Sequence, residues 1–115
     1  MQYMILIYGD EKAWAHLTPE QAAEVMSAYY AYTKALKASG KLVAGDELHP
    51  VATAKSLTVR DGKRNVVDGP YVETKESLGG YYLVDVENEA EALDWAAKCP
   101  GAMYGGVEVR PIVVR

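Results

Sequence analysis

The chain of 115 residues has little cysteine and no phenylalanine. Its single cysteine, Cys99, excludes a disulfide within the chain and excludes any metal site built from several cysteines, which favours a reducing compartment such as the cytoplasm. Cys99 lies on the apolar side of a predicted helix. We therefore expect a buried side chain and not a reactive thiol.

Clustered positive charge and long apolar runs are also missing. The chain has 12 Lys and Arg against 16 Asp and Glu, with a net charge of -4, and its basic residues are scattered. Proteins that bind nucleic acid neutralise phosphates with clustered bases, so no nucleic-acid partner is expected. No apolar run approaches the roughly 20 residues of a membrane-spanning helix. Residues 1–8 lack a basic leader and a cleavage site, and predict a strand, not a signal peptide.

The length predicts one domain over residues 1–115. A chain of this size buries one hydrophobic core, but it is close to the size at which a second copy helps to bury surface. We therefore expect a homodimer.

Two helices are predicted from capping signals. Residues 18–21, Thr-Pro-Glu-Gln, form a capping box with proline at the first helical position, and apolar residues follow at helical spacing as far as Gly40. Asn88 with Glu91 three residues later repeats the signal, and Pro100 stops the second helix.

The predicted strands surround these helices. Residues 56–60 and 64–67 form a hairpin at Asp61-Gly62, and the other strands are residues 1–8, 81–86 and 107–114, while residues 41–50 read as turns. The element order β-α-β-β-β-α-β predicts an α+β, ferredoxin-like fold, in which an antiparallel sheet carries both helices on one face.

The opposite face of this sheet needs a partner, because residues 1–8 and 81–86 offer apolar side chains to both faces. Two copies packed sheet against sheet would cover it and could enclose a cavity for a small ligand. Tyr81 and Tyr82 point to opposite faces. We take Tyr82 as the cleft-facing ring that donates a hydrogen bond to a ligand.

The segment 68–82 concentrates turn residues and charge. Gly69 and Pro70 hold Asp68 on a defined corner, where its carboxylate could accept backbone hydrogen bonds or take part in catalysis. Glu73, Lys75 and Glu76 follow within a few positions. They form a proton-transfer site if they face a cavity, and only a solvated loop if they do not.

His49 is the candidate base outside this segment. If Asp46 or Glu47 folds back on the ring, one nitrogen of His49 becomes a usable base near neutral pH, and the alternative is a histidine in solvent. His16, His49 and Asp46 have ligand types suited to a metal, but their spacing matches no known metal site. The candidate catalytic residues are His49, Asp68, Glu73 and Lys75; the candidate ligand-binding residues are Tyr82, Glu76 and Asp46; no cofactor or metal is expected.

The motif residues carry a family resemblance. Residues 68–82 resemble the DGPF subgroup of the YCII-related proteins, with Tyr71 in place of the usual phenylalanine, and residues 91–96, 99–101 and 107–111 extend the match. The resemblance implies a dimeric α+β barrel. The wider group includes proteins proposed to act on small organic molecules through a His and Asp pair, but neither histidine of this chain lies in the matched motif.

Three hypotheses follow. The first is a homodimeric enzyme that performs proton transfer without an organic cofactor, of isomerase or lyase type, on a small molecule in the dimer cavity. The second is a non-catalytic ligand-binding or regulatory dimer that uses the same cavity. The third is a structural dimer whose sheets close on each other and leave no cavity.

Overall fold

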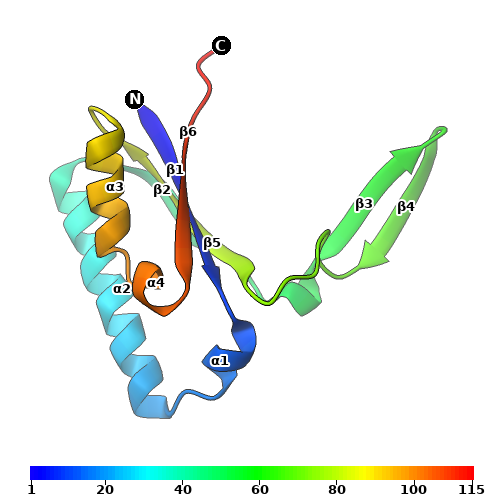
Figure 1. Ribbon diagram of the computed structural model, residues 1–115, viewed down its shortest axis with the longest axis horizontal. Helices are drawn as coiled ribbons and strands as arrows, with labels where there is room; N and C mark the ends of the chain where they lie inside the picture. Colours follow the sequence, from blue (N-terminus) through cyan, green and yellow to red (C-terminus); the bar gives the residue numbers. More distant parts are fainter.

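The computed structural model describes residues 1–115 and is built around a four-stranded antiparallel sheet (Figure 1). Its strands, in the order in which they lie across the sheet, are β2 (Leu42–Glu47), β5 (Ser77–Asp85), β1 (Gln2–Gly9) and β6 (Gly106–Pro111). The two central strands are thus the first and the third of the four along the chain, the ferredoxin-like arrangement. The predicted fold class is confirmed.

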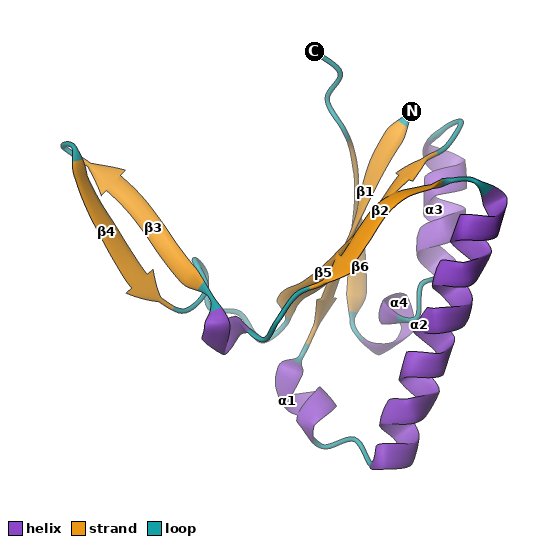
Figure 2. Ribbon diagram, turned by 180° about the vertical axis from the view of Figure 1, so that it is seen from behind, coloured by secondary structure: helices purple, strands orange, loops and turns teal.

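Two long helices lie on one side of this sheet, α2 (Pro19–Ser39) and α3 (Glu89–Lys98) (Figure 2). Helix α2 begins at the predicted capping box, in which the Thr18 hydroxyl accepts from the Gln21 amide at 3.1 Å and the Gln21 side chain accepts from the Thr18 amide at 3.0 Å. The Asn88 side chain caps α3. None of the helices is long and apolar enough to cross a membrane.

The shorter helical segments were not predicted from the sequence. They are α1 (Glu11–Ala15), a 3₁₀ turn over Val51–Thr53, and α4 (Gly101–Tyr104). Helix α1 follows directly on β1, and α4 leads into β6. Each is five residues or fewer, too short for a hydrophobic period to appear in the sequence.

Strand β2 corrects one prediction, because residues 41–50 were expected to form turns. Leu42 pairs with Val84, but Ala44 pairs with Leu83, so Val43 is an extra residue that interrupts the register. This bulge breaks the alternation of apolar and polar side chains by which a strand is recognised. The glycine and acidic residues that follow are tolerated because β2 is an edge strand.

The predicted hairpin forms, but it does not belong to the main sheet. Strands β3 (Lys55–Arg60) and β4 (Lys63–Asp68) pair only with each other and extend away from the body (Figure 1). Their turn has Asp61 at φ 50° and Gly62 at φ 74°, as a two-residue hairpin loop requires. We call residues 55–68 the arm. It raises the radius of gyration to 16.1 Å, against about 13 Å for a compact chain of this length.

The core lies between the sheet and the two helices. Its fully buried side chains are Ile5, Leu36, Val84 and Cys99. The Tyr32 ring packs edge-on against the Tyr82 ring, with their centroids 5.2 Å apart. Burial of Cys99 is confirmed, and this burial raises the pKa of its thiol, which keeps the sulfur protonated and unreactive at neutral pH.

Ionisable groups in this core predict a loss of stability at alkaline pH. Burial raises the pKa of Tyr29, Tyr32, Tyr82 and Cys99, because it disfavours their anions. Their folded-state pKa values thus lie above the unfolded values, roughly 8.5 for cysteine and 10 for tyrosine. The stability that they contribute is present below those unfolded values and is lost as the pH rises above them.

We expect the urea midpoint to stay constant between about pH 7 and 8 and to fall steadily above about pH 9. Tyr32→Phe should weaken this alkaline dependence, because it removes one buried phenol. Tyr30→Phe is the matched control, since the Tyr30 ring is exposed on the same helix. A midpoint independent of pH up to 11 would contradict the prediction.

Candidate functional site

The face of the sheet away from the helices carries two rows of side chains that cross all four strands. The backbone register aligns Asp46, Tyr81, Leu6 and Glu108 in one row and Ala44, Leu83, Met4 and Arg110 in the next. No segment of the chain covers these residues in the views of Figures 1 and 2. We call these eight residues the open face. Its centre is apolar and its polar groups stand at the two edges.

Tyr81 and Asp46 form a hydrogen-bonded pair at one edge of the open face. The Tyr81 hydroxyl donates to Oδ2 of Asp46 at 2.8 Å. The two residues are register partners on β5 and β2, so backbone pairing places them side by side before any side chain rotates. The hydrogen bond to Asp46, followed by the charge of that carboxylate, raises the pKa of Tyr81. Tyr81 therefore remains a protonated donor at neutral pH.

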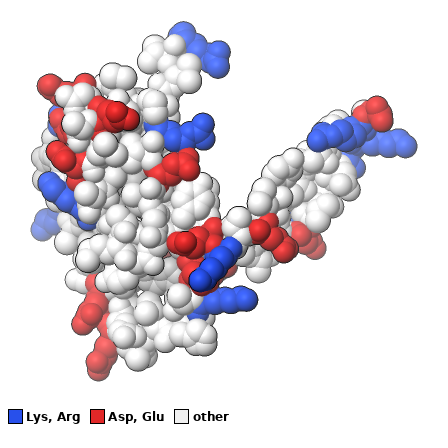
Figure 3. Space-filling model, in the orientation of Figure 1, with Lys and Arg blue, Asp and Glu red and all other residues white.

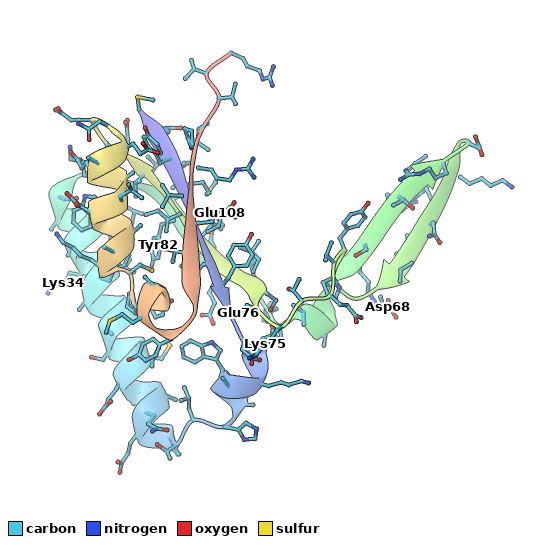
Figure 4. The ribbon with its side chains drawn as sticks, in the orientation of Figure 1. Lys34, Asp68, Lys75, Glu76, Tyr82 and Glu108 are labelled. Atoms are coloured by element: carbon cyan, nitrogen blue, oxygen red, sulfur yellow. The ribbon has the colours of Figure 1, made fainter.

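The other edge of the open face carries Glu108 and Arg110 on β6. Arg110 Nε lies 3.8 Å from Glu108 Oε2, and both side chains are exposed. Figure 4 places Glu108 on the opposite side of the sheet from Tyr82. An exposed ion pair of this length stabilises the fold little.

Tyr82 does not face this surface, and this corrects the choice of Tyr82 as the cleft-facing ring. It points under the helices and is only 9% exposed. Its hydroxyl is 2.7 Å from Thr33 Oγ1 on α2. The sequence predicted that Tyr81 and Tyr82 face opposite sides, but the helices cover the side of Tyr82, and Tyr81 is the ring on the open face.

Asp68 lies at the base of the arm, where it pairs with Lys55 (Figure 4). The next residue, Gly69, has φ 108°, a conformation that favours glycine, and its amide donates to the Ala54 carbonyl at 2.8 Å. The Ser56 hydroxyl donates to the Gly69 carbonyl at 2.8 Å. These three interactions, which we call the clasp, hold the two ends of the arm together.

The remaining candidates from the sequence are exposed and lie on the segments next to β2 and β5. His49 follows the end of β2, and Glu73, Lys75 and Glu76 lie on the segment between the arm and β5. Figure 4 shows Lys75 and Glu76 near each other at the start of β5, with Asp68 well apart on the arm. Asp68 and Lys75 therefore do not meet within one protomer.

Glu11 is a polar contact that sequence reasoning missed. Its Oε2 accepts from the Val51 amide at 3.0 Å and so ties α1 to the turn after β2. No local signal links residues 40 positions apart, so the contact could not have been found from the sequence. His16 ends α1 and is exposed. No group of three or more His, Cys, Asp or Glu side chains is placed to hold a metal ion.

Two surface hollows lie elsewhere on the protomer. One, of about 560 Å³, is lined by Met1, Lys41 and Asp85 among others at the end of the sheet. The second, of about 360 Å³, lies between α2, α3 and α4 and is mostly apolar. Neither is lined by Asp46 or Tyr81. Both hollows thus lie outside the open face.

Comparisons with known proteins identify relatives of the whole chain. The model of the YCII-related domain matches residues 1–114. An uncharacterized protein of Rhizobium meliloti is 36% identical over 116 residues, which cover 99% of this chain and 94% of that protein. Among solved structures, 5-chloro-2-hydroxyhydroquinone dehydrochlorinase from Burkholderia phenoliruptrix, in complex with 2,5-dihydroxybenzoquinone, is similar with a TM-score of 0.52 and 16% identity. The match covers 98% of this chain and 94% of that one.

Proposed function

The chain belongs to the YCII-related domain family, and we propose that it is a homodimeric, cofactor-independent enzyme that transfers protons on a small molecule, of isomerase or lyase type. The observation that carries this proposal is the hydrogen bond of 2.8 Å between Tyr81 and Asp46 on the open face. In the proposed dimer, the open faces of two copies enclose the reacting molecule.

Asp46 and Tyr81 have complementary roles in this proposal. Asp46 forms no ion pair, so its carboxylate is available to take a proton from carbon or oxygen of the bound molecule. When the bound molecule takes the place of the Tyr81–Asp46 hydrogen bond, Tyr81 turns its single hydroxyl hydrogen to the oxygen of the substrate on which negative charge develops. The pKa of Tyr81 is raised, so the phenol stays protonated as this role requires.

The apolar centre of the open face supports the proposal from a second direction. Met4, Leu6 and Leu83 lie beside the polar pair and are half-buried already in one protomer. A second copy packed over them would remove water, and a carboxylate in a drier site is a stronger base. The same side chains offer a flat apolar floor on which a planar ring can lie.

The dehydrochlorinase shares the fold at 16% identity, and that likeness alone does not carry its reaction to this chain. The substrate and the bound quinone of that enzyme do suggest which molecules to test first. Loss of hydrogen chloride is a lyase reaction that begins with proton removal, which is the chemistry proposed for Asp46. We therefore propose hydroxylated aromatic or quinonoid rings as the first substrate class to test.

The other candidates from the sequence receive different roles. We propose that His49, Glu73, Lys75 and Glu76 lie at the rim of the cavity, because they stand at the ends of β2 and β5 a few residues from Asp46 and Tyr81. There they can contact a ligand without performing the chemistry. Asp68 is proposed to hold the arm, through its ion pair with Lys55.

The proposal is tested by incubating the purified chain with 5-chloro-2-hydroxyhydroquinone and measuring chloride release, and by titrating it with 2,5-dihydroxybenzoquinone. We expect chloride release above the uncatalysed rate and saturable binding of the quinone. Binding without release of chloride from any ring of this class would favour the non-catalytic ligand-binding dimer. A chain that neither binds nor turns over such rings would refute the proposed substrate class.

A further inference from the structure

The arm has two chemically different faces. Register pairs Leu57 with Val66 and places Val59, opposite Arg64, on the same side. Ser56, Thr58 and Asn65 point to the other side, where Val67 is the one large apolar residue. Leu57, Val59 and Val66 are 49%, 51% and 52% exposed, so nothing in the protomer covers them. We call these three residues the apolar stripe. An apolar stripe along one face of an isolated hairpin is a surface without its partner.

An isolated two-stranded hairpin is marginally stable in water, because it has no third layer against which to bury its side chains. The arm joins the body only at its base, where the clasp of Lys55 with Asp68 and of Gly69 with Ala54 and Ser56 holds its two ends together. Figures 1 and 2 show the rest of the arm extending clear of the sheet and helices. The arm thus carries the stripe away from the surface of its own body.

The surface area of the protomer indicates how much is uncovered. The chain exposes 8416 Å², whereas a compact protein of 12.6 kDa exposes about 6,200 Å². Two protomers together carry an excess of roughly 4,400 Å², which lies within the roughly 2,000–5,000 Å² that obligate dimers bury in total over both partners. The protomer therefore carries the amount of unsatisfied surface that a second copy would bury.

Charge favours a second copy as the occupant. The arm has four basic residues and two acids, which gives it a net charge of +2. Because the whole chain has a net charge of -4, the residues outside the arm have a net charge of -6. Figure 3 shows Lys and Arg side chains gathered at the far end of the arm. By sequence, the basic residues of this tip are Arg60, Lys63 and Arg64. Asp61 in the turn offsets one of these three positive charges, and the body of another copy offers negative charge for the other two.

We propose that the arm of each protomer docks on the second protomer of the dimer, with the apolar stripe packed against that protomer and the basic tip beside its acidic side chains. This inference rests on the dimer of the proposed function and adds its interface element. A two-fold arrangement makes the exchange reciprocal, so that each copy both gives and receives an arm.

The experiment compares two neighbouring positions on β3. Leu57→Lys places a charge on the apolar stripe, and Thr58→Lys places the same charge on the opposite face of the same strand. We expect sedimentation equilibrium to show that the unchanged chain is a dimer. The dimer dissociation constant should be at least about 30-fold higher for Leu57→Lys and nearly the same as that of the unchanged chain for Thr58→Lys. Circular dichroism checks that both variants are folded, which is expected since residue 57 is half exposed in the protomer. Val59→Lys repeats the test at a second stripe position.

Equal dissociation constants for Leu57→Lys, Val59→Lys and Thr58→Lys would overturn the inference, and so would an unchanged chain that is monomeric. Failure of the arm and failure of the proposed function are distinguishable. If the stripe variants stay dimeric while the unchanged chain releases chloride, only the docking of the arm is wrong. If the stripe variants dissociate and the unchanged dimer neither binds nor turns over the ring probes, the arm is supported and the reaction is wrong.

Discussion

Replacement of Gly105 by alanine is expected to lower the thermal unfolding midpoint by about 8–12 °C. Gly105 lies between α4 and β6, and a Cβ atom there would be 2.2 Å from the Tyr8 carbonyl oxygen and 3.1 Å from the Gly9 Cα. Both atoms belong to the backbone of β1 and cannot rotate away. Relief requires β6 to separate from β1, at a cost of about 2–3 kcal/mol, and each kcal/mol shifts the midpoint of a small domain by roughly 4 °C.

Gly106→Ala is the matched control for this prediction. Gly106 is the next residue, at the start of β6, and a Cβ added there meets no atom within 4 Å. We expect its midpoint to stay within about 2 °C of the unchanged chain. Differential scanning calorimetry on the two variants measures the contrast. Equal midpoints would mean that β6 and β1 do not approach each other at Gly105 as described.

The second large effect is expected at the polar pair of the open face. Asp46→Asn keeps the shape of the side chain but removes the base, and should lower kcat/KM for chloride release from 5-chloro-2-hydroxyhydroquinone by about 10²- to 10⁴-fold. Tyr81→Phe removes one hydrogen-bond donor and should lower it by roughly 10²-fold. Neither change should affect the unfolding midpoint, because Asp46 is exposed and the Tyr81 hydroxyl bonds only to it.

Glu47→Gln is the control for Asp46→Asn. Glu47 is the next residue on β2, so its side chain alternates to the other face, and it is exposed. Its replacement should leave the rate unchanged. The pH profile adds a readout for Tyr81: because its pKa is raised, the donor is lost only at strongly alkaline pH, and where both chains are still folded Tyr81→Phe should show a smaller alkaline decline than the unchanged chain. An Asp46→Asn variant with full activity would remove Asp46 from the proposed chemistry.

Sequence reasoning succeeded where the signal is local. The capping box at Thr18, the cap at Asn88 and the turn at Asp61-Gly62 each depend on residues within four positions, and all three form as predicted. The covered side of the sheet is not local information. Alternation predicts that Tyr81 and Tyr82 face opposite sides, but only the packing of α2 against Tyr82 decides which ring is buried.

The hairpin shows the same limit on a larger scale. Its strands and its turn could be predicted, but its separation from the main sheet could not, because that depends on β2 taking the edge position beside β5. Strand β2 was not predicted because the bulge at Val43 interrupts its alternation of apolar and polar side chains. The turn at Gly69-Pro70 predicted that the Asp68 carboxylate is held at a defined corner. The partner of this carboxylate is Lys55, on the opposite strand of the arm. A turn motif alone does not show whether the carboxylate will meet a lysine or a ligand.

The clasp has a consequence for how this chain tolerates change in length. Ala54 and Gly69 are joined by a direct backbone hydrogen bond, so the chain leaves the body and returns to it at a single point. An insertion or deletion between those two residues alters how far the hairpin reaches without shifting any strand of the main sheet. The number of residues in the arm can therefore differ between relatives, and with it the length of the arm, while the rows of the open face keep their register.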